Sequence, residues 1–240
     1  MTVQVVFVHG IRTSSTMWRA QAAHLRQRGN GMIAVDLPGH GTRRGEPFTL
    51  EEAFATIDRA VQDAAARGPV VLVGHSMGGL LSMEYVGRED PPPVAALVAA
   101  SCTSLPRGPG LATYRFLIRR ADGLPDRGLG FTNRVLDFTL PPETRPDFGA
   151  GGYAFEAQDS ALASLTNLDL MASLRRIDVP LWFVNGQWDQ LRLNEKLFTT
   201  LAPHAELIVV PRTTHIVTAM RPRVFNAVLD VALTTVEASS

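Results

Sequence analysis

The stretch Gly74–Gly78, with the sequence GHSMG, places a serine between two glycines. The apolar, β-branched run Val70–Val73 before it predicts a buried strand, and the apolar spacing after it predicts a helix. A turn from strand to helix within one or two residues would strain the backbone of Ser76, and a Cβ at Gly74 or Gly78 would collide with this turn. This pattern is typical of a nucleophile elbow, G-x-S-x-G, which presents the serine hydroxyl at the edge of a sheet.

Two other interpretations of the motif compete with the elbow. With 20 glycines in 240 residues, a chance match is expected on the order of a tenth of the time, so the motif alone does not decide. Gly74, Ser76 and Gly79 also form a degenerate dinucleotide-binding fingerprint. That fingerprint requires an acidic residue at the end of the next strand, and the next apolar run, Val94–Ser101, does not end in one. We therefore discard the nucleotide site.

A serine hydroxyl is a poor nucleophile near pH 7 and needs a base, usually a histidine, with a third group to orient it. His215 follows the predicted strand ELIVVP by a short loop, at the edge where the carboxyl ends of parallel strands would lie. We expect His215 to be the base, with a purely structural histidine as the alternative. The remaining histidines are less suitable as the base. His75 adjoins the serine, His40 lies in a turn, His24 lies in a predicted helix and His204 lies at the wrong end of a strand. His9 lies next to the end of the first strand, where we expect it to support the loop.

The acid that orients the base should follow another strand on the same edge. Asp189 comes shortly after the predicted strand within LWFVNGQWDQ, whereas Asp178 precedes that strand and would lie at the opposite edge. Asp36 belongs to the sequence DLPGHG, which is more typical of a turn in which the carboxylate accepts backbone N–H groups. The expected order Ser76, Asp189, His215 is the chain order of α/β-hydrolases.

Acyl transfer also needs donors for an oxyanion. The backbone N–H of Met77, directly after the serine, is the first expected donor. The second should come from the loop that follows the first strand, where Gly10 allows the backbone to approach the site. We predict that the N–H of Ile11 is this second donor. Removing one such donor typically lowers the rate about 10²–10³-fold.

Elements that could position these residues alternate along the chain, which indicates a parallel sheet with helices on both faces. The expected strands are Val3–Val8, Met32–Val35, Val70–Val73, Val94–Ala100, Val179–Val184 and Leu207–Val210. The expected helices are Met17–Arg28, Leu50–Ala66, Gly79–Arg88, Glu195–Leu201 and Arg223–Val236. The interval 103–177 breaks the alternation and is rich in Gly, Pro and Arg. We interpret residues 1–102 and 178–240 as an α/β core and residues 103–177 as a mostly helical cap insertion.

Composition excludes several other classes of protein. The formal net charge is zero, which offers no global attraction for nucleic acid or an anionic membrane. The single cysteine, Cys102, excludes an internal disulfide framework and a cysteine-based zinc site, and we expect it to be a buried small hydrophobe. No apolar run approaches the length of a membrane span, and the N-terminus shows no signal-peptide pattern. We predict a cytoplasmic protein that needs no metal or cofactor.

Taken in order, the segments HGIRTSSTMW, DLPGHG, GHSMGG and NGQWD, with His215 after them, resemble the α/β-hydrolase superfamily. The start at VVFVHG makes the chain similar to the compact branch that includes plant methylesterases and hydroxynitrile lyases. The resemblance implies Ser76, Asp189 and His215 as a catalytic triad, with Ile11 and Met77 as oxyanion donors. Ile11 and Arg192 do not supply the threonine and lysine of the lyases, so we do not expect lyase activity.

We therefore predict a serine hydrolase that cleaves a carboxylic ester, lactone or related acyl bond of a small molecule through an acyl-enzyme. Hydrolysis of a C–C bond, acyl transfer to an alcohol or amine, cofactor-free oxygen chemistry and a ligand-binding protein with little turnover remain open alternatives. For the substrate pocket we nominate Arg12, Trp18 and Trp188. Further apolar side chains that could line it are Tyr114, Phe116, Leu117, Phe131 and Phe138, although plain packing explains most of them equally well.

Overall fold

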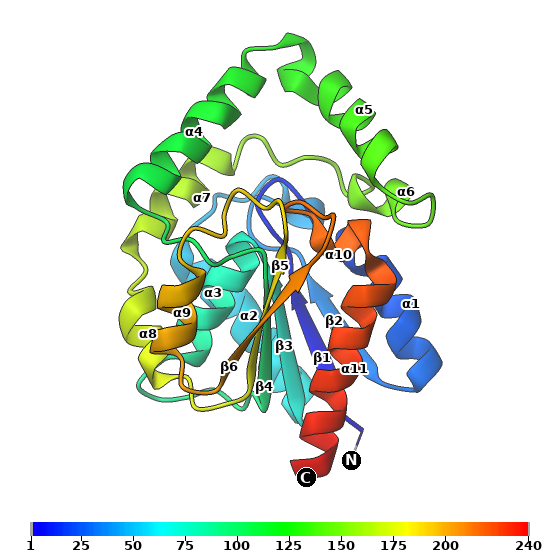
Figure 1. Cartoon of the computed structure of the whole chain (residues 1–240), viewed down its shortest axis with the longest axis vertical. Coiled ribbons are helices and arrows are strands. Elements are labelled where there is room, and N and C mark those ends of the chain that lie inside the picture. The colour runs from blue at the N-terminus through cyan, green and yellow to red at the C-terminus, as the bar shows by residue number, and fades with distance from the viewer. Residues whose placement is uncertain (1, 240) are drawn as a thin grey trace.

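The structure is a computed structural model that describes residues 2–239, without the side chains of Pro109, Gly110, Thr113, Leu117 and Ala121. Its centre is one parallel sheet with the strand order β2-β1-β3-β4-β5-β6 (Figure 1). The strands are β1 (Gln4–Val8), β2 (Gly31–Val35), β3 (Val70–His75), β4 (Ala96–Ala100), β5 (Leu181–Gly186) and β6 (Ala205–Val210). All six predicted strands are confirmed, with boundaries that differ by two residues or fewer.

Helices cover both faces of the sheet, as the predicted alternation requires. The helices of these two layers are α1 (Arg19–Arg28), α2 (Leu50–Ala65), α3 (Met77–Val86), α8 (Leu170–Arg176), α9 (Glu195–Leu201) and α11 (Pro222–Ser239). Thr49 caps the start of α2, because its side chain accepts the N–H of Glu52 at 3.2 Å. Gly29 ends α1 in a left-handed conformation with φ of 81°.

Alternate residues along each strand belong to different hydrophobic clusters, because successive side chains of a strand point to opposite faces. In β1, Val6 and Val8 pack with α2, α3, α8 and α9, whereas Val5 and Phe7 pack with α1 and α11. The strands are therefore apolar on both sides, which explains why they read as continuous apolar runs rather than alternating ones. Among the described residues, no helix is long and apolar enough to cross a membrane.

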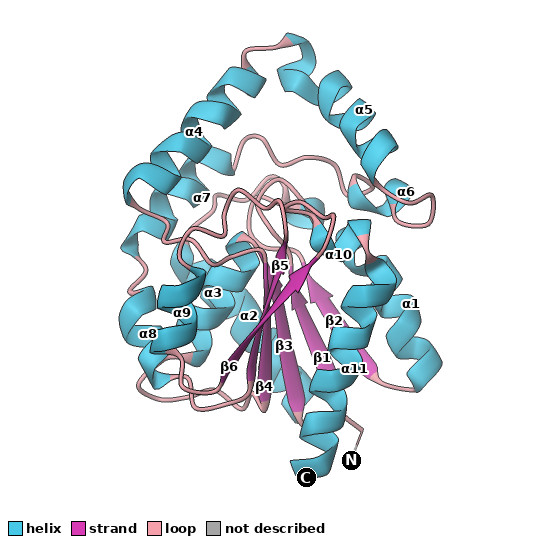
Figure 2. Cartoon of the chain, viewed as in Figure 1, coloured by secondary structure: helices cyan, strands magenta, loops and turns pink. Residues whose placement is uncertain are grey.

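The interval between β4 and β5 contains helices and no strand among its described residues. Its elements before α8 are α4 (Gly108–Asp122), η3 (Pro125–Gly128), α5 (Leu129–Thr139), α6 (Arg145–Phe148), α7 (Gln158–Ser164) and η4 (Leu165–Asn167). Figure 2 shows α4 and α5 forming an arch above the carboxyl ends of the strands. We call residues 103–177 the insertion.

The last helix of the insertion, α8, lies on the flank of the sheet beside α3. Glu84 of α3 accepts the hydroxyl of Ser173 at 2.9 Å, and Arg176 donates to the carbonyl of Gly87 at 2.7 Å. We propose that the cap is formed by the elements from α4 to η4 and that α8 packs as part of the core.

Candidate active site

Ser76 lies at the junction of β3 and α3 with φ of 53° and ψ of −119°, a conformation that L residues rarely adopt. Its N–H donates to the carbonyl of Ala100 at 2.8 Å, which ties the turn to β4. A Cβ added to Gly78 would lie 2.3 Å from the carbonyl oxygen of Val8, and one added to Gly74 would lie 2.5 Å from that of Gly78. The predicted strained elbow and the predicted need for both glycines are therefore confirmed.

The structure brings Ser76, His215 and Asp189 together from three separate loops. The His215 Nε2 lies 2.9 Å from the Ser76 Oγ, and the Nδ1 lies 3.1 Å from each carboxylate oxygen of Asp189. Asp189 follows β5 and His215 follows β6, so both loops lie at the carboxyl edge of the sheet. Such an arrangement can transfer the serine proton to the imidazole while the carboxylate stabilises the imidazolium that forms.

The carboxylate of Asp189 is held in its ionised form. Burial alone would raise the pKa of Asp189, but attraction to His215, hydrogen bonding from His215 and the N–H of Leu191 together lower it. The N–H of Leu191 lies 2.8 Å from one carboxylate oxygen, and the side chain of Asp189 is fully buried. The buried carboxylate of Asp189, held by these partners, orients the imidazole of His215 through the Nδ1 of the ring.

His75 contacts the backbone of His215, and this role was not apparent in the sequence. The Nε2–H of His75 donates to the carbonyl oxygen of His215 at 2.9 Å. Burial, followed by repulsion from His215, lowers the pKa of His75 to about 3, so this ring is neutral. His75 therefore fixes the loop that carries His215, and its position next to the serine was the only signal for it.

Ile11 and Met77, whose backbone N–H groups remain the predicted oxyanion donors, both border a cavity at Ser76, and neither N–H has a hydrogen-bond partner among the described residues. The carbonyl of Gly10 accepts the Nδ1–H of His9 and the hydroxyl of Thr13, each at 2.8 Å. Because a trans peptide is planar, this anchored carbonyl aims the N–H of Ile11 in the opposite direction. Gly10 permits the close approach, since an added Cβ would lie 2.8 Å from the His75 ring.

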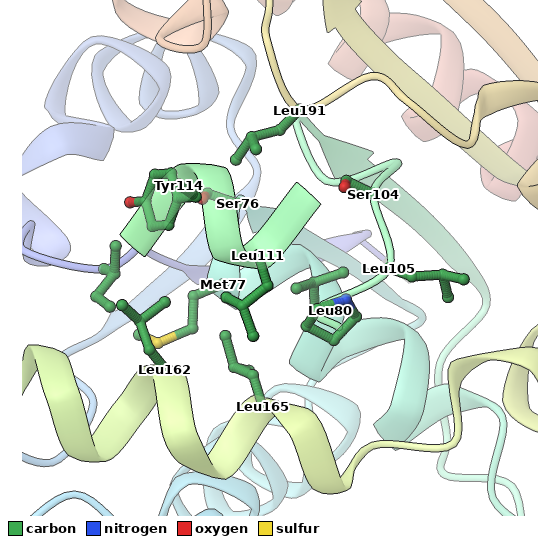
Figure 3. A pocket seen from close by; sticks show the side chains of 12 residues that line it. Ser76, Met77, Leu80, Ser104, Leu105, Leu111, Tyr114, Leu162, Leu165 and Leu191 are labelled. Atoms are coloured by element: carbon green, nitrogen blue, oxygen red, sulfur yellow. The ribbon is translucent and has the colours of Figure 1, made fainter. Parts of the chain in front are cut away.

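Two cavities meet at Ser76, and Ile11 and Tyr114 border both of them. The first has a cavity volume of about 50 Å³ and is bordered by Met77. Leucines from the core and the insertion line it: Leu80, Leu105, Leu111, Leu162, Leu165 and Leu191. Figure 3 shows these leucines and Met77 around the first cavity, with Leu162 beside Met77. The second, with a cavity volume of about 150 Å³, is bordered by His215, by Arg12 and by aromatic residues of the insertion.

The predictions for the pocket residues had mixed outcomes. Arg12 borders the second cavity, but its guanidinium is already paired with Asp122. Trp18 is wrong as a pocket residue, because it is fully buried and stacks on Phe7 with ring centroids 4.7 Å apart. Trp188 also borders neither cavity, and 60% of its surface is exposed to solvent. The spacing of apolar residues does not reveal which side of the site a tryptophan faces.

Of the further apolar candidates for the pocket, one borders the cavities and three are exposed to solvent. Tyr114 borders both cavities, and burial raises its pKa to about 12, so the phenol is un-ionised. Phe116, Phe131 and Phe138 are exposed on the insertion, and the side chain of Leu117 lies outside the described residues. Cys102 is buried, as predicted, and burial raises its pKa.

The sequence profile of the alpha/beta hydrolase family matches residues 5–228. The chain belongs to this family. Among its relatives, the "Probable esterase PIR7A" of rice (Oryza sativa subsp. indica) is 35% identical over 144 residues, which cover 58% of this chain and 53% of the rice protein. The "Lipase LipV" of Mycobacterium tuberculosis is 35% identical over 96 residues, covering 40% of this chain and 35% of that one. The matches thus span about half or less of these relatives.

Solved structures agree with the alpha/beta hydrolase fold over the whole chain. A structure reported for carboxylesterases of the thaumarchaeon Nitrososphaera gargenis has a TM-score of 0.78 at 18% identity, covering 100% of this chain and 92% of that one. MenH from S. aureus has a TM-score of 0.75 at 19% identity, covering 99% of this chain and 96% of that one. At these identities the likeness establishes the fold alone.

Proposed function

We propose that this protein is a serine hydrolase that cleaves carboxylic esters or lactones of small molecules through an acyl-enzyme. The observation that carries this proposal is the continuous hydrogen-bonded path from the Ser76 hydroxyl through both ring nitrogens of His215 to Asp189. The esterase and lipase names of the relatives support ester hydrolysis as the general reaction. A cytoplasmic location remains a prediction from the sequence.

In the proposed mechanism the Ser76 Oγ attacks the substrate carbonyl carbon while the His215 Nε2 takes the serine proton. The carbonyl oxygen becomes an oxyanion held by the N–H groups of Ile11 and Met77. His215 then gives its proton to the leaving oxygen, the bond to that oxygen breaks, and an ester to Ser76 remains. Water, deprotonated by the same imidazole, hydrolyses this ester and returns the proton to Ser76. Each proton or acyl transfer in this mechanism takes place between protein groups, water and substrate, so the proposed mechanism requires no cofactor.

The two cavities support one orientation of the substrate. The leaving oxygen must lie within reach of the His215 Nε2, and among the described residues His215 borders the second cavity and not the first. The leaving group therefore extends into the second cavity and the acyl chain into the first, beside Met77. Because the first cavity is lined mainly by leucines, we propose an aliphatic acyl chain longer than acetyl. Each buried methylene should raise kcat/KM about fourfold, from about 0.8 kcal/mol, until the cavity is filled.

The test is hydrolysis of p-nitrophenyl esters of increasing acyl length by the wild type and by Ser76→Ala. Turnover that vanishes in Ser76→Ala supports the serine mechanism, and the best chain length measures the acyl cavity. Leu165→Phe should shorten that best length, whereas Leu124→Phe, on an exposed part of the insertion, should leave it unchanged. Wild-type protein that neither hydrolyses any ester nor reacts with a fluorophosphonate at Ser76 would contradict the proposal.

A further inference from the structure

The guanidinium of Arg12 is held by three residues of the insertion. Its Nη2 donates to Asp122 at the end of α4, and its Nε donates to the side-chain carbonyl of Gln158 at the start of α7. The ring of Phe155 lies beneath the guanidinium carbon at 4.7 Å. Gln158 also donates to Asp122 at 3.1 Å, which closes a ring of three polar side chains. Only 18% of the Arg12 side chain is exposed.

This network argues against Arg12 as a receptor for an anionic substrate. The charge of Arg12 is already matched by the carboxylate of Asp122, and the Nε and the ring face each have a partner. A substrate carboxylate would have to displace Asp122 and break the bond to Gln158. The network instead joins a residue of the loop after β1 to two helices more than a hundred residues away in the sequence.

The backbone of Arg12 shows why this loop needs support. Its φ of 62° lies in the left-handed region, where a residue other than glycine is disfavoured and persists only if its surroundings hold it. The carbonyl of Arg12 accepts the N–H of Ala154, again from the insertion, at 3.4 Å. Arg12 directly follows Ile11, so relaxation of this φ would redirect the chain next to the Ile11 N–H.

We propose that Arg12, Asp122 and Gln158 form a strut that positions the oxyanion loop, so that docking of the insertion on the core adds to the Gly10 anchors in placing the Ile11 N–H. This inference rests on the proposed function in its assignment of Ile11 as a donor. Arg12 is accordingly a positioning residue. The strut couples the reaction to the placement of the insertion. The helices that carry the strut, α4 and α7, also line the first cavity.

A second ion pair provides a matched control. Arg19 of α1 and Asp147 of α6 also join the core to the insertion, with 3.0 Å between the Arg19 Nη1 and a carboxylate oxygen. The side chains of Asp122 and Asp147 are similarly exposed, at 27% and 25%. Asp122→Ala and Asp147→Ala each remove one carboxylate of such a pair, and only the first removes a contact to the residue beside Ile11.

The experiment measures the second-order rate at which a fluorophosphonate labels Ser76, the kcat and KM for the best ester, and the melting temperature of each variant. The phosphoryl oxygen of the probe occupies the place of the oxyanion, so labelling reports on the Ile11 donor. Asp122→Ala should lower the labelling rate and kcat on the order of tenfold and leave KM within twofold of the wild type. This decrease is smaller than the decrease expected when an oxyanion donor is removed completely. Asp147→Ala should keep the wild-type rates at a comparable melting temperature, and the exchanged pair Arg12→Glu/Asp122→Arg should restore most of the rate.

Wild-type rates in Asp122→Ala, or an equal loss in Asp147→Ala, would overturn the strut. Failure of the proposed function is recognised separately, as absence of labelling in the wild type itself. In that case the amide resonance of Ile11 in ¹⁵N-labelled protein decides the inference. The resonance should move in Asp122→Ala and stay in place in Asp147→Ala, and a resonance unchanged in both would refute the positioning role.

Discussion

Lowering the pH from 7 to 5 should protonate His9 and His75 in the unfolded chain but not in the folded protein. Both rings are buried, and burial is the main reason that the pKa of each lies at about 3, against 6.5 in an exposed chain. The hydrogen bonds agree with neutral rings, because His9 accepts the N–H of Leu37 at 3.0 Å through its Nε2. A proton on that nitrogen would remove the acceptor and leave a buried charge.

The sign and size of the effect follow from proton linkage. The folded pKa values are depressed, so the stabilisation is fully present above about pH 6.5 and is lost progressively as the pH falls toward 3. Between pH 7 and pH 5 each histidine should reduce the free energy of unfolding by about 2 kcal/mol, and the pair by about 4 kcal/mol. His40, whose pKa burial also lowers, adds in the same direction. This loss is a large fraction of the stability of an ordinary domain, about 5–15 kcal/mol.

The assay is urea unfolding at several pH values between 5 and 7, from which the slope of stability against pH gives the number of protons taken up on unfolding. We expect uptake of at least two protons near pH 5, and about one fewer in His75→Gln. A wild-type slope near zero would refute the reasoning, because it would mean that the buried rings titrate normally in the folded protein.

Three further predictions concern the carboxylate of the proposed triad, the elbow and the two tryptophans. Asp189→Asn should lower kcat about 10⁴-fold at neutral pH with an unchanged fold, because an amide favours the wrong tautomer of the base; near wild-type kcat would remove Asp189 from the mechanism. Gly78→Ala should destabilise the protein by about 2 kcal/mol or more in thermal unfolding, because the added Cβ meets a backbone carbonyl of β1. Gly130→Ala should not destabilise it, because a Cβ there meets open space. Equal melting temperatures of the two variants would contradict this account. Trp18→Ala should lower the free energy of unfolding by about 3–5 kcal/mol, measured by urea unfolding. Trp188→Ala should leave both stability and esterase activity close to wild type. An activity loss confined to Trp188→Ala would show that Trp188 does belong to the substrate pocket.

The sequence alone predicted the six strands, the helices α1, α2, α3, α9 and α11 but not α8, and the three residues of the proposed triad. These features are local, because an apolar run before a glycine-flanked serine or a short loop after a strand can be recognised within a few residues. The sheet then adds a strong constraint. In a parallel sheet all carboxyl ends lie at one edge, so residues that follow β3, β5 and β6 meet there once the strand order is formed.

The tertiary structure alone decided the environments of individual side chains. Trp18 and Trp188 look alike in the sequence, yet one is fully buried and the other is 60% exposed, because burial depends on distant partners such as Phe225. Arg12 meets Asp122 across 110 residues, and no periodicity reports such a pair. The shape of the cavities likewise depends on how α4 and α7 dock over the sheet. Residue type and spacing thus determined which groups could react, whereas packing between remote segments decided what surrounds them.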